Sequence, residues 1–162
     1  MDHNNRSPRV ADAAATRAAL PFDRLIPALR AAFIAGAEAP LRTRHSVGGD
    51  ASLLMMPAWK PGAALGVKLV SVFPGNNAHG LESVSSTYLL CDGATGRHLA
   101  VLDGREITGR RTAAASALAG DFLARSDARE VLVVGAGHIA SLMPAAWRAV
   151  RPIQHVSVWN RS

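Results

Sequence analysis

The chain has 162 residues, of which 49% are hydrophobic and 19% charged, a balance typical of a globular protein rather than a disordered one. No apolar run approaches the roughly 20 residues that a membrane-spanning helix needs, and the polar N-terminus lacks the apolar core of a secretory signal. The single cysteine, Cys91, excludes an internal disulfide and suits a reducing compartment. We therefore expect a cytoplasmic protein without membrane attachment.

The net charge of +6 is the one feature that favours a nucleic-acid partner, because basic surfaces attract phosphates. The arginines are scattered, however, with no run longer than Arg110–Arg111, and few aromatic residues are present to stack on bases. A solvated basic surface explains the charge better, so we expect no nucleic-acid partner. The histidines show no spacing that fits metal ligation, and we expect no metal.

The first third of the chain predicts one helix. Residues 1–20 are polar and then alanine-rich, and we expect them to be partly disordered. Apolar residues then recur at helical spacing from Phe22 to Ala37. Asp23 is the expected N-cap, Pro27 lies near the first turn where a missing N–H costs least, and Gly36 ends the helix.

The middle of the chain predicts strands joined by turns. Pro74 to Asn77 is a strong turn signal, and residues 92–96 resemble a hairpin loop. Asp103-Gly104 closes this region. The expected strands are residues 52–59, 64–73, 84–91 and 97–102.

The last third predicts a helix followed by a strand–helix–strand unit. Thr108 is the expected cap of a helix that runs to about Ala124 and has an alanine-rich face for close packing. The polar stretch 125–129 is the best domain boundary. The elements expected after it are strand 131–134, helix 138–150 and strand 155–159.

A glycine turn between that strand and helix points to a dinucleotide. The apolar run 131–134 enters Gly135, Gly137 and Ala140, spaced as G-x-G-x-x-A. In such a turn the first glycine permits the tight bend and the second admits a pyrophosphate to the backbone. The small third residue lets the helix pack on the strand. The alternative, an ordinary strand-to-helix turn, is weakened by this placement.

The end of the second strand bears on the choice of cofactor. A carboxylate there would accept hydrogen bonds from the adenosine ribose of NAD(H). The chain has the donors Asn160, Arg161 and Ser162 instead, which suit a 2′-phosphate. We therefore favour NADP(H) and keep NAD(H) as one alternative. The other alternative is a polar strand end that binds no cofactor.

Three basic residues are candidates for a substrate site. Lys68, one of only two lysines, is either a proton-handling ammonium in a sheltered pocket or a lysine on the solvent face of an edge strand. Arg111 falls about three residues after Thr108, where a guanidinium in the first helical turn would clamp a carboxylate. The alternative is a surface arginine, and Arg42 has no chemical signal of its own.

Taken as an ordered series, the motifs resemble one family, the ornithine cyclodeaminase and mu-crystallin proteins. The resemblance covers nearly all of this chain but only the N-terminal half of a typical member. The matching motifs are Pro40-Leu41-Arg42-Thr43, Met55-Met56-Pro57-Ala58-Trp59, Gly66-Val67-Lys68-Leu69-Val70, Phe73-Pro74-Gly75-Asn76, Thr87-Tyr88-Leu89-Leu90, Leu102-Asp103-Gly104, Arg111 to Ser116, Val134 to Gly137 and Trp159-Asn160-Arg161.

The resemblance implies an α/β fold in two parts. Residues 21–127 would form part of an α+β substrate-binding and dimerisation domain, and residues 128–162 the first βαβ unit of a Rossmann domain. Family members are homodimers that act on amino acids or cyclic imino acids. By motif match, Arg42 and Arg111 would bind the substrate carboxylate, Met56 would line the pocket, and Lys68 would stand at the reacting carbon.

Two chemistries fit the resemblance. A reductase would use NADPH to reduce a cyclic imino acid such as Δ1-pyrroline-2-carboxylate to proline. An ornithine cyclodeaminase would use NAD⁺ to convert ornithine to proline and ammonia. The Asn160-Arg161-Ser162 ending favours the reductase.

The family also uses an acidic residue in its second half, a position that this chain does not have. We therefore expect the chain by itself to be poorly stable and catalytically weak or inactive. A truncated, non-catalytic relative is the third interpretation.

Overall fold

The computed structural model describes residues 7–161, which form two compact units. The first unit comprises the described residues up to Thr16 together with Gly36–Arg105, and the second comprises Arg17–Ala35 together with the described residues from Glu106 onward. The boundary predicted at 127/128 is therefore not the one between the units. The helix that precedes it packs with the C-terminal elements through its alanine face.

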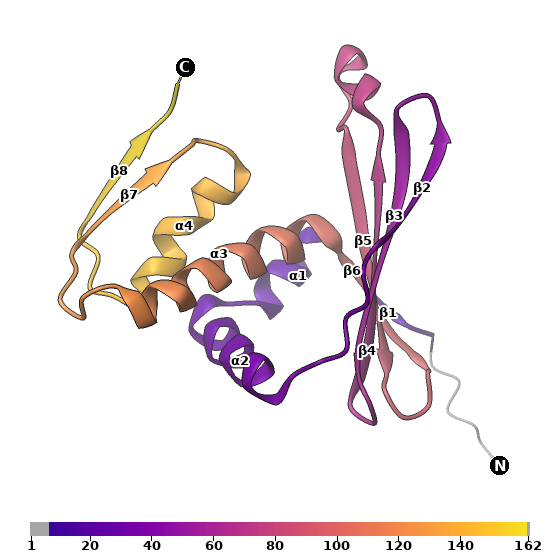
Figure 1. The fold of residues 1–162 in the computed structure, drawn as a ribbon, viewed down its shortest axis with the longest axis horizontal. Helices are drawn as coiled ribbons and strands as arrows, with labels where there is room; N and C mark the ends of the chain where they lie inside the picture. The colour runs from indigo at the N-terminus through magenta and orange to yellow at the C-terminus, as the bar shows by residue number, and fades with distance from the viewer. Residues whose placement is uncertain (1–6, 162) are drawn as a thin grey trace. The chain divides into compact units, whose positions relative to one another are not determined.

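A six-stranded sheet makes up most of the first unit (Figure 1). The strand order is β1-β6-β5-β4-β3-β2, with β1 parallel to β6 and every other neighbouring pair antiparallel. The four strands predicted from residues 52–102 are confirmed as β3 to β6. The strands are β1 (Arg9–Ala11), β2 (Thr43–Gly48), β3 (Ala51–Lys60), β4 (Ala64–Val72), β5 (Val84–Asp92) and β6 (His98–Asp103).

The N-terminal segment holds regular structure that the sequence did not predict. Where partial disorder was expected, residues 9–19 form β1 and α1 (Ala13–Ala19), while residues 1–6 lie outside the described part of the chain. The fully buried Thr16 hydroxyl donates to the carbonyl of Ala11 at 3.2 Å and accepts from the amide of Asp103 at 3.1 Å. These two bonds fix β1 beside the end of β6, a long-range constraint that a three-residue strand does not reveal in sequence.

The two predicted turns of the sheet unit form with specific geometry. Pro74 to His79 is a short 3-10 helix, η1, ended by Gly80 with a positive φ of 69°. In the hairpin loop, the Asp92 carboxylate accepts hydrogen bonds from the amides of Ala94 and Thr95 and from the Thr95 hydroxyl. These bonds, led by those from Thr95, lower the pKa of Asp92.

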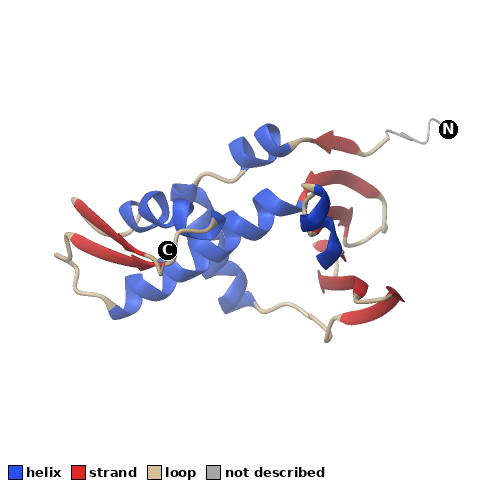
Figure 2. Ribbon diagram, turned by 90° about the horizontal axis from the view of Figure 1, so that it is seen from above, coloured by secondary structure: helices blue, strands red, loops and turns tan. Residues whose placement is uncertain are grey.

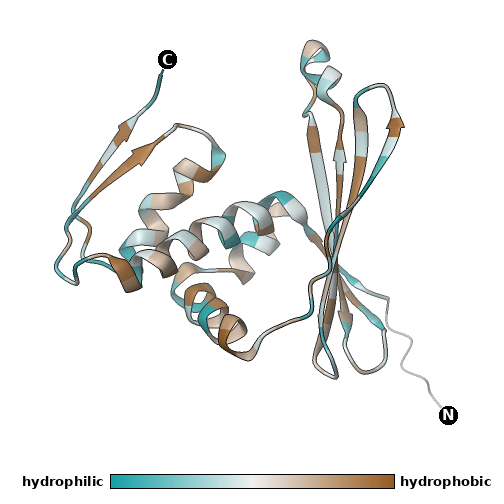
Figure 3. Ribbon diagram, in the orientation of Figure 1, coloured by the Kyte–Doolittle hydropathy of each residue, from teal (hydrophilic) through white to brown (hydrophobic). Residues whose placement is uncertain are grey.

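Three helices build the core of the second unit: α2 (Phe22–Ala35), α3 (Gly104–Leu123) and α4 (His138–Arg148). Ala113, Ala114, Ala117 and Ala146 are fully buried and let the helix backbones approach closely. The predicted first helix is confirmed and ends before Gly36, which has a φ of 72°, but Asp23 lies inside its first turn rather than at the cap. Figure 3 shows the apolar residues of these helices and of β7.

The α3 helix begins four residues earlier than predicted, directly at the end of β6. Gly104 is its first residue, and a Cβ there would lie 2.6 Å from the backbone carbonyl carbon of Ser86, so this close approach requires glycine. Glu106 in the first turn is buried and accepts a hydrogen bond from the Arg17 guanidinium at 2.6 Å, which lowers the pKa of Glu106. Thr108 lies within the helix rather than at its N-cap, and its carbonyl accepts a hydrogen bond from the Thr112 hydroxyl.

The C-terminal elements form the predicted strand–helix–strand unit. The parallel strands β7 (Glu130–Val134) and β8 (His155–Trp159) are connected through α4 (Figure 2). The Arg151 guanidinium donates to the carbonyls of Asp121 at 2.6 Å and Ala124 at 2.9 Å, so it satisfies backbone acceptors at the end of α3. The expected α/β architecture is therefore present, with a mixed sheet in one unit and a βαβ arrangement in the other.

Candidate active site and dinucleotide-binding turn

The sheet aligns four residues in one row across its strands. Met56 on β3 is the Cα partner of Lys68 on β4, which is the partner of Tyr88 on β5, which is the partner of Leu102 on β6. Directly opposed residues in antiparallel strands project to the same face of a sheet. Two of the predicted site residues, Met56 and Lys68, are therefore neighbours on one face.

Lys68 does not lie on an edge strand. Its strand, β4, is paired over nine residues with β3 and over nine residues with β5, and the lysine is half-buried. The edge-strand alternative is therefore wrong. An ammonium group on an interior strand has side chains of both neighbouring strands beside it and is more sheltered than one on an edge strand.

Arg42 lies at the β2 end of this row. It immediately precedes Thr43, and Thr43 pairs with Met55 in the antiparallel ladder between β2 and β3. Continuing this register by one residue beyond the end of β2 would bring Arg42 level with Met56. Its side chain is exposed. The sheet unit thus brings Arg42, Met56 and Lys68 into one neighbourhood, although 26 positions separate the first from the last in sequence.

Arg111 belongs to the second unit and not to the first turn of its helix. Because α3 begins at Gly104, Arg111 is its eighth residue, and the backbone amides around it bond within the helix. The predicted clamp of a guanidinium beside free helix N–H groups is therefore wrong for this position. Arg111 is exposed, so its guanidinium is accessible to a carboxylate by charge alone.

The glycine turn has the geometry that the pattern predicts. Gly135 has a φ of +112°, a region that favours glycine, and its amide donates to the Trp159 carbonyl at 2.7 Å. Gly137 is the N-cap residue of α4, and it has no side chain to accept hydrogen bonds from the first N–H groups of the helix. A Cβ on either glycine would meet nothing within 4 Å, so the protein itself leaves this space open.

These features fit a dinucleotide pyrophosphate. The φ of −80° at Gly137 is available to any residue, so the chain's own packing does not demand glycine there. A bare backbone at the start of an eleven-residue helix instead suits the close approach of an anion. The half-buried Ala140 lies in the first turn of α4.

The residues expected at the 2′-position of the cofactor follow β8 directly. Asn160 and Arg161 are exposed and come immediately after Trp159, whose carbonyl is bonded to the glycine turn. The strand end and the turn are therefore adjacent within this unit. The third predicted residue, Ser162, lies outside the described residues.

Tyr88 lies on the same face as Lys68, although reasoning from the sequence did not single it out as a site residue. A Cβ on the buried Gly66 would lie 1.8 Å from the Tyr88 hydroxyl, so the phenol lies directly over that glycine. Burial raises the pKa of Tyr88, with a smaller contribution from Cys91. The available signal was an isolated glycine inside a strand, which indicates a close approach by another group.

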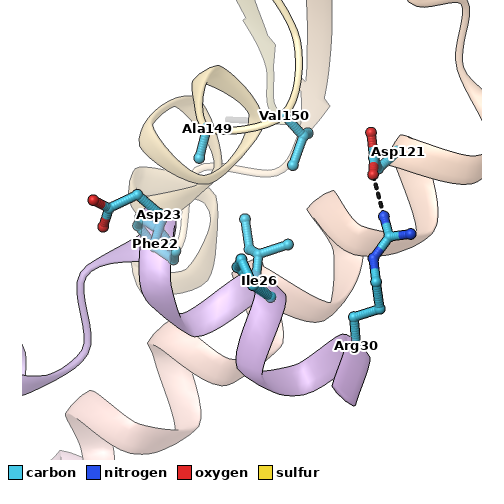
Figure 4. A pocket seen from close by; sticks show the side chains of 8 residues that line it. Phe22, Asp23, Ile26, Arg30, Asp121, Ala149 and Val150 are labelled. Carbon is cyan, nitrogen blue, oxygen red and sulfur yellow. Dashed lines mark hydrogen bonds and ion pairs between the residues drawn. The ribbon is translucent and has the colours of Figure 1, made fainter. Parts of the chain in front are cut away.

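A hollow of about 270 Å³ in the second unit contains none of the predicted site residues (Figure 4). Arg30 forms an ion pair with Asp121 at its edge. Among residues 7–161, no cluster of histidine, cysteine or acidic side chains fits a metal ion. No helix in this part of the chain has the length and hydropathy to span a membrane.

The fold and site define a class: a mixed α/β protein with a sheet-borne lysine and a dinucleotide-type glycine turn. The sequence profile of the ornithine cyclodeaminase/mu-crystallin family matches residues 7–162, and the chain belongs to that family. It is 48% identical over 143 residues to an uncharacterised protein of Schizosaccharomyces pombe, covering 84% of this chain and 43% of that one. It is 41% identical over 111 residues to the Δ(1)-pyrroline-2-carboxylate reductase of Paracoccus denitrificans, covering 68% and 35%.

Solved structures show the same fold. The Thermococcus litoralis Δ(1)-pyrroline-2-carboxylate reductase in complex with NADH and L-proline matches with a TM-score of 0.71 and 32% identity, over 95% of this chain and 50% of that one. A lysine cyclodeaminase matches with a TM-score of 0.74 and 29% identity, over 97% and 50%. An archaeal alanine dehydrogenase dimer with bound NAD matches with 0.78 and 27%, over 94% and 48%. The chain thus spans about half the length of these relatives or less.

Proposed function

We propose that this chain carries the substrate lysine and the dinucleotide-binding turn of an NADPH-dependent reductase. Its substrate would be a cyclic imino acid of the Δ1-pyrroline-2-carboxylate type, and its product proline or a similar amino acid. The observation that carries the proposal is the interior position of Lys68, directly opposite Met56, with Arg42 next to Thr43 at the start of β2. Similarity to named pyrroline-2-carboxylate reductases supports the reaction class.

Each basic residue has a role that follows from the chemistry of an imino acid. Arg42 and Arg111 bind the substrate carboxylate, since a guanidinium pairs with it through two parallel hydrogen bonds. Lys68 lies at the reacting C=N group, where its ammonium stabilises charge and handles the proton that the nitrogen gains on reduction. Met56 contributes an apolar wall beside it. The C=N bond becomes CH–NH when carbon gains a hydride and nitrogen a proton.

A nicotinamide dinucleotide supplies the hydride in this reaction. Gly135 and Gly137 would hold its pyrophosphate against the first turn of α4, with Ala140 keeping that turn small. We propose NADP(H) rather than NAD(H), because Asn160 and Arg161 are donors and no carboxylate stands directly after β8 in the described chain. Ser162 would complete this set.

The cofactor choice is tested by titrating the full chain with NADPH and with NADH and following cofactor fluorescence. Arg161→Ala should weaken NADPH binding by about 10- to 100-fold, the equivalent of one charge-assisted bond, and leave NADH binding unchanged. Arg129→Ala is the matched control, since Arg129 is also exposed but precedes β7 at the opposite end of the strands. Equal loss of both cofactors in Arg161→Ala would contradict the NADP(H) preference.

The role of Lys68 is tested with the only other lysine as its control. Cofactor oxidation with Δ1-pyrroline-2-carboxylate, and proline formation by mass spectrometry, should fall by about 100-fold or more in Lys68→Met, a typical loss for a proton-handling group. Lys60→Met changes an exposed residue at the end of β3 and should retain activity. Because the chain by itself is expected to turn over weakly, binding of L-proline in the presence of NADP⁺ is measured alongside. A wild-type chain that neither forms proline nor binds L-proline would contradict the proposed function.

Ornithine cyclodeaminase is the second candidate, favoured by the likeness to a lysine cyclodeaminase structure. It differs in being redox-neutral, so ornithine and NAD⁺ would yield ammonia and proline without net cofactor reduction. An ammonia assay with ornithine separates the two chemistries. Ammonia release without net NADH formation would favour the cyclodeaminase.

We also propose that the protein assembles as a homodimer, a proposal supported by its likeness to an archaeal alanine dehydrogenase dimer. Large apolar side chains of the sheet unit stand in solvent in the single chain, among them Leu69 at 40% and Val84 at 52% exposure. A second copy is the expected cover. Light scattering coupled to size exclusion should give twice the 17.0 kDa chain mass, and a monomeric mass would contradict this.

A further inference from the structure

Tyr88 stands beside Lys68, but the proposed reaction assigns it no role. We propose that the Tyr88 ring is the wall of the substrate site that limits the ring size of the imino acid. The inference rests on the proposed function, because it takes Lys68 to mark the substrate position. It adds a specificity-determining residue to that site.

The position of the ring follows from the sheet register and from one glycine. Tyr88 is the Cα partner of Lys68, so both side chains leave the same face. Gly66, two residues before Lys68 on β4, shares that face and has no side chain. The Tyr88 hydroxyl and ring fill the space above Gly66, where a Cβ would be 1.8 Å from the oxygen and 2.4 Å from Cζ.

The ring therefore closes one side of the space next to Lys68. Along β4, the bare Gly66 would leave a gap between Lys68 and the start of the strand, and the phenol occupies it. Across the sheet, Met56 stands on the other side of Lys68. A substrate held by Lys68 is thus bounded by a thioether on one side and an aromatic ring on the other.

The chemical state of the phenol suits a wall rather than a proton donor. Burial raises its pKa, so the group stays neutral and adds no negative charge beside a substrate carboxylate. An aromatic ring is also rigid, with two side-chain torsions, and resists displacement by one extra methylene. A fixed neutral wall selects by volume.

The selectivity that such a wall provides can be expressed per methylene group of the substrate. One methylene in an apolar pocket changes kcat/KM by about 10- to 200-fold. Five-membered Δ1-pyrroline-2-carboxylate and six-membered Δ1-piperideine-2-carboxylate differ by one methylene. The Tyr88 wall should therefore favour the smaller ring, and removing the aromatic ring should shift the ratio of the two kcat/KM values toward the larger one.

The experiment compares this ratio in the full chain and three variants. Tyr88→Leu should raise the relative kcat/KM for the six-membered substrate by about tenfold or more. Tyr88→Phe keeps the ring and should keep the wild-type ratio. Leu89→Val, on the same strand but the opposite face, is the matched control and should also keep it.

Two kinetic results would overturn the inference while leaving the proposed function intact. One is an unchanged ratio in Tyr88→Leu with normal turnover of the five-membered ring. The other is a large loss of kcat in Tyr88→Phe with an unchanged ratio. That result would mean that Tyr88 acts in turnover through its hydroxyl and not in selection through its ring volume.

A binding measurement tests the wall independently of turnover. Because Tyr88 is the only tyrosine, a chain labelled with [ζ-13C]tyrosine gives one resonance. Saturating L-proline in the presence of NADP⁺ should shift it, whereas acetate, a carboxylate without a ring, should not. An unmoved resonance would overturn the inference, and together with absent turnover it would overturn the proposed function as well.

Discussion

The two units of this chain are stabilised differently. Among the described residues of the helical unit, nine apolar residues are buried. Seven of them lie on α2, α3 and α4, one follows α4, and one lies on β7. In the described part of the sheet unit, Cys91 is the only residue of that kind. The nine are Phe22, Ile26, Ala113, Ala114, Ala117, Leu118, Val133, Ala146 and Ile153.

This difference shows which interactions stabilise each unit. Helices with buried alanine faces gain stability from apolar burial. The six strands instead depend on their hydrogen-bond ladders and keep most apolar side chains half-exposed. The proposed cofactor turn lies on the well-packed unit and the proposed substrate row on the other. The side-chain positions in that row therefore depend more on the groups that pack over the sheet.

The largest expected effect is a cavity in the helical core. Ile26 is 4% exposed, and Ile26→Ala should reduce the free energy of unfolding by about 2–5 kcal/mol. Urea titration followed by circular dichroism measures the loss. Hydrogen exchange should accelerate in α2, α3 and α4 before it does in β3 to β5.

The matched truncation in the sheet unit should cost much less. Leu69 on β4 is 40% exposed, so Leu69→Ala should cost about 1 kcal/mol or less, since little area leaves contact. If the two substitutions destabilise equally, the contrast between the units is wrong.

A backbone contact should matter more in the sheet unit than any of its apolar side chains. Gly104→Ala forces a Cβ to 2.6–2.7 Å from the backbone of Ser86, which should cost about 1–3 kcal/mol. Gly75→Ala is the control, because its Cβ would meet nothing within 4 Å. The same urea midpoints compare them, and a neutral Gly104→Ala would mean that β5 and the start of α3 move apart freely.

The Thr16 hydroxyl offers a finer test of the sheet unit. Thr16→Val preserves the shape but removes both hydrogen bonds and leaves the Asp103 amide without this acceptor. The expected loss of stability is about 1–2 kcal/mol. Exchange of the Asp103 amide should rise selectively, and an unchanged rate would show that β1 is held in another way.

The smallest effect is a pH dependence in the helical unit. Arg17 lowers the pKa of the buried Glu106, so the unfolded chain binds this proton more readily than the folded one. The pair therefore stabilises the fold above the unfolded pKa of about 4.3 and loses that contribution as pH falls through the folded value. Urea midpoints from pH 6 to pH 3 should fall less steeply in Glu106→Gln. Glu82→Gln, at a 63% exposed carboxylate, is the control. A slope shared by both variants would contradict this assignment.

Local patterns predicted the βαβ unit, the glycine turn and four of the six sheet strands, because each is encoded within about ten adjacent residues. They did not predict β1, β2 or α1, which are short or held by distant partners such as Asp103. The start of α3 was misplaced because Thr108 resembles a cap, whereas the close approach of Gly104 to Ser86 fixes the true start. The placement of Tyr88 beside Lys68 required the register of β4 against β5.

The interior position of β4 also constrains how this chain tolerates changes in length. A deletion of one residue between Ala64 and Lys68 shifts the lysine by one position along the strand, so its side chain would turn to the other face, away from Met56 and Tyr88. Both neighbouring ladders would then have to mispair or bulge. We expect insertions and deletions to be accepted in the loops at 61–63 and 93–97 and to be rejected inside β4, even where every remaining side chain is unchanged.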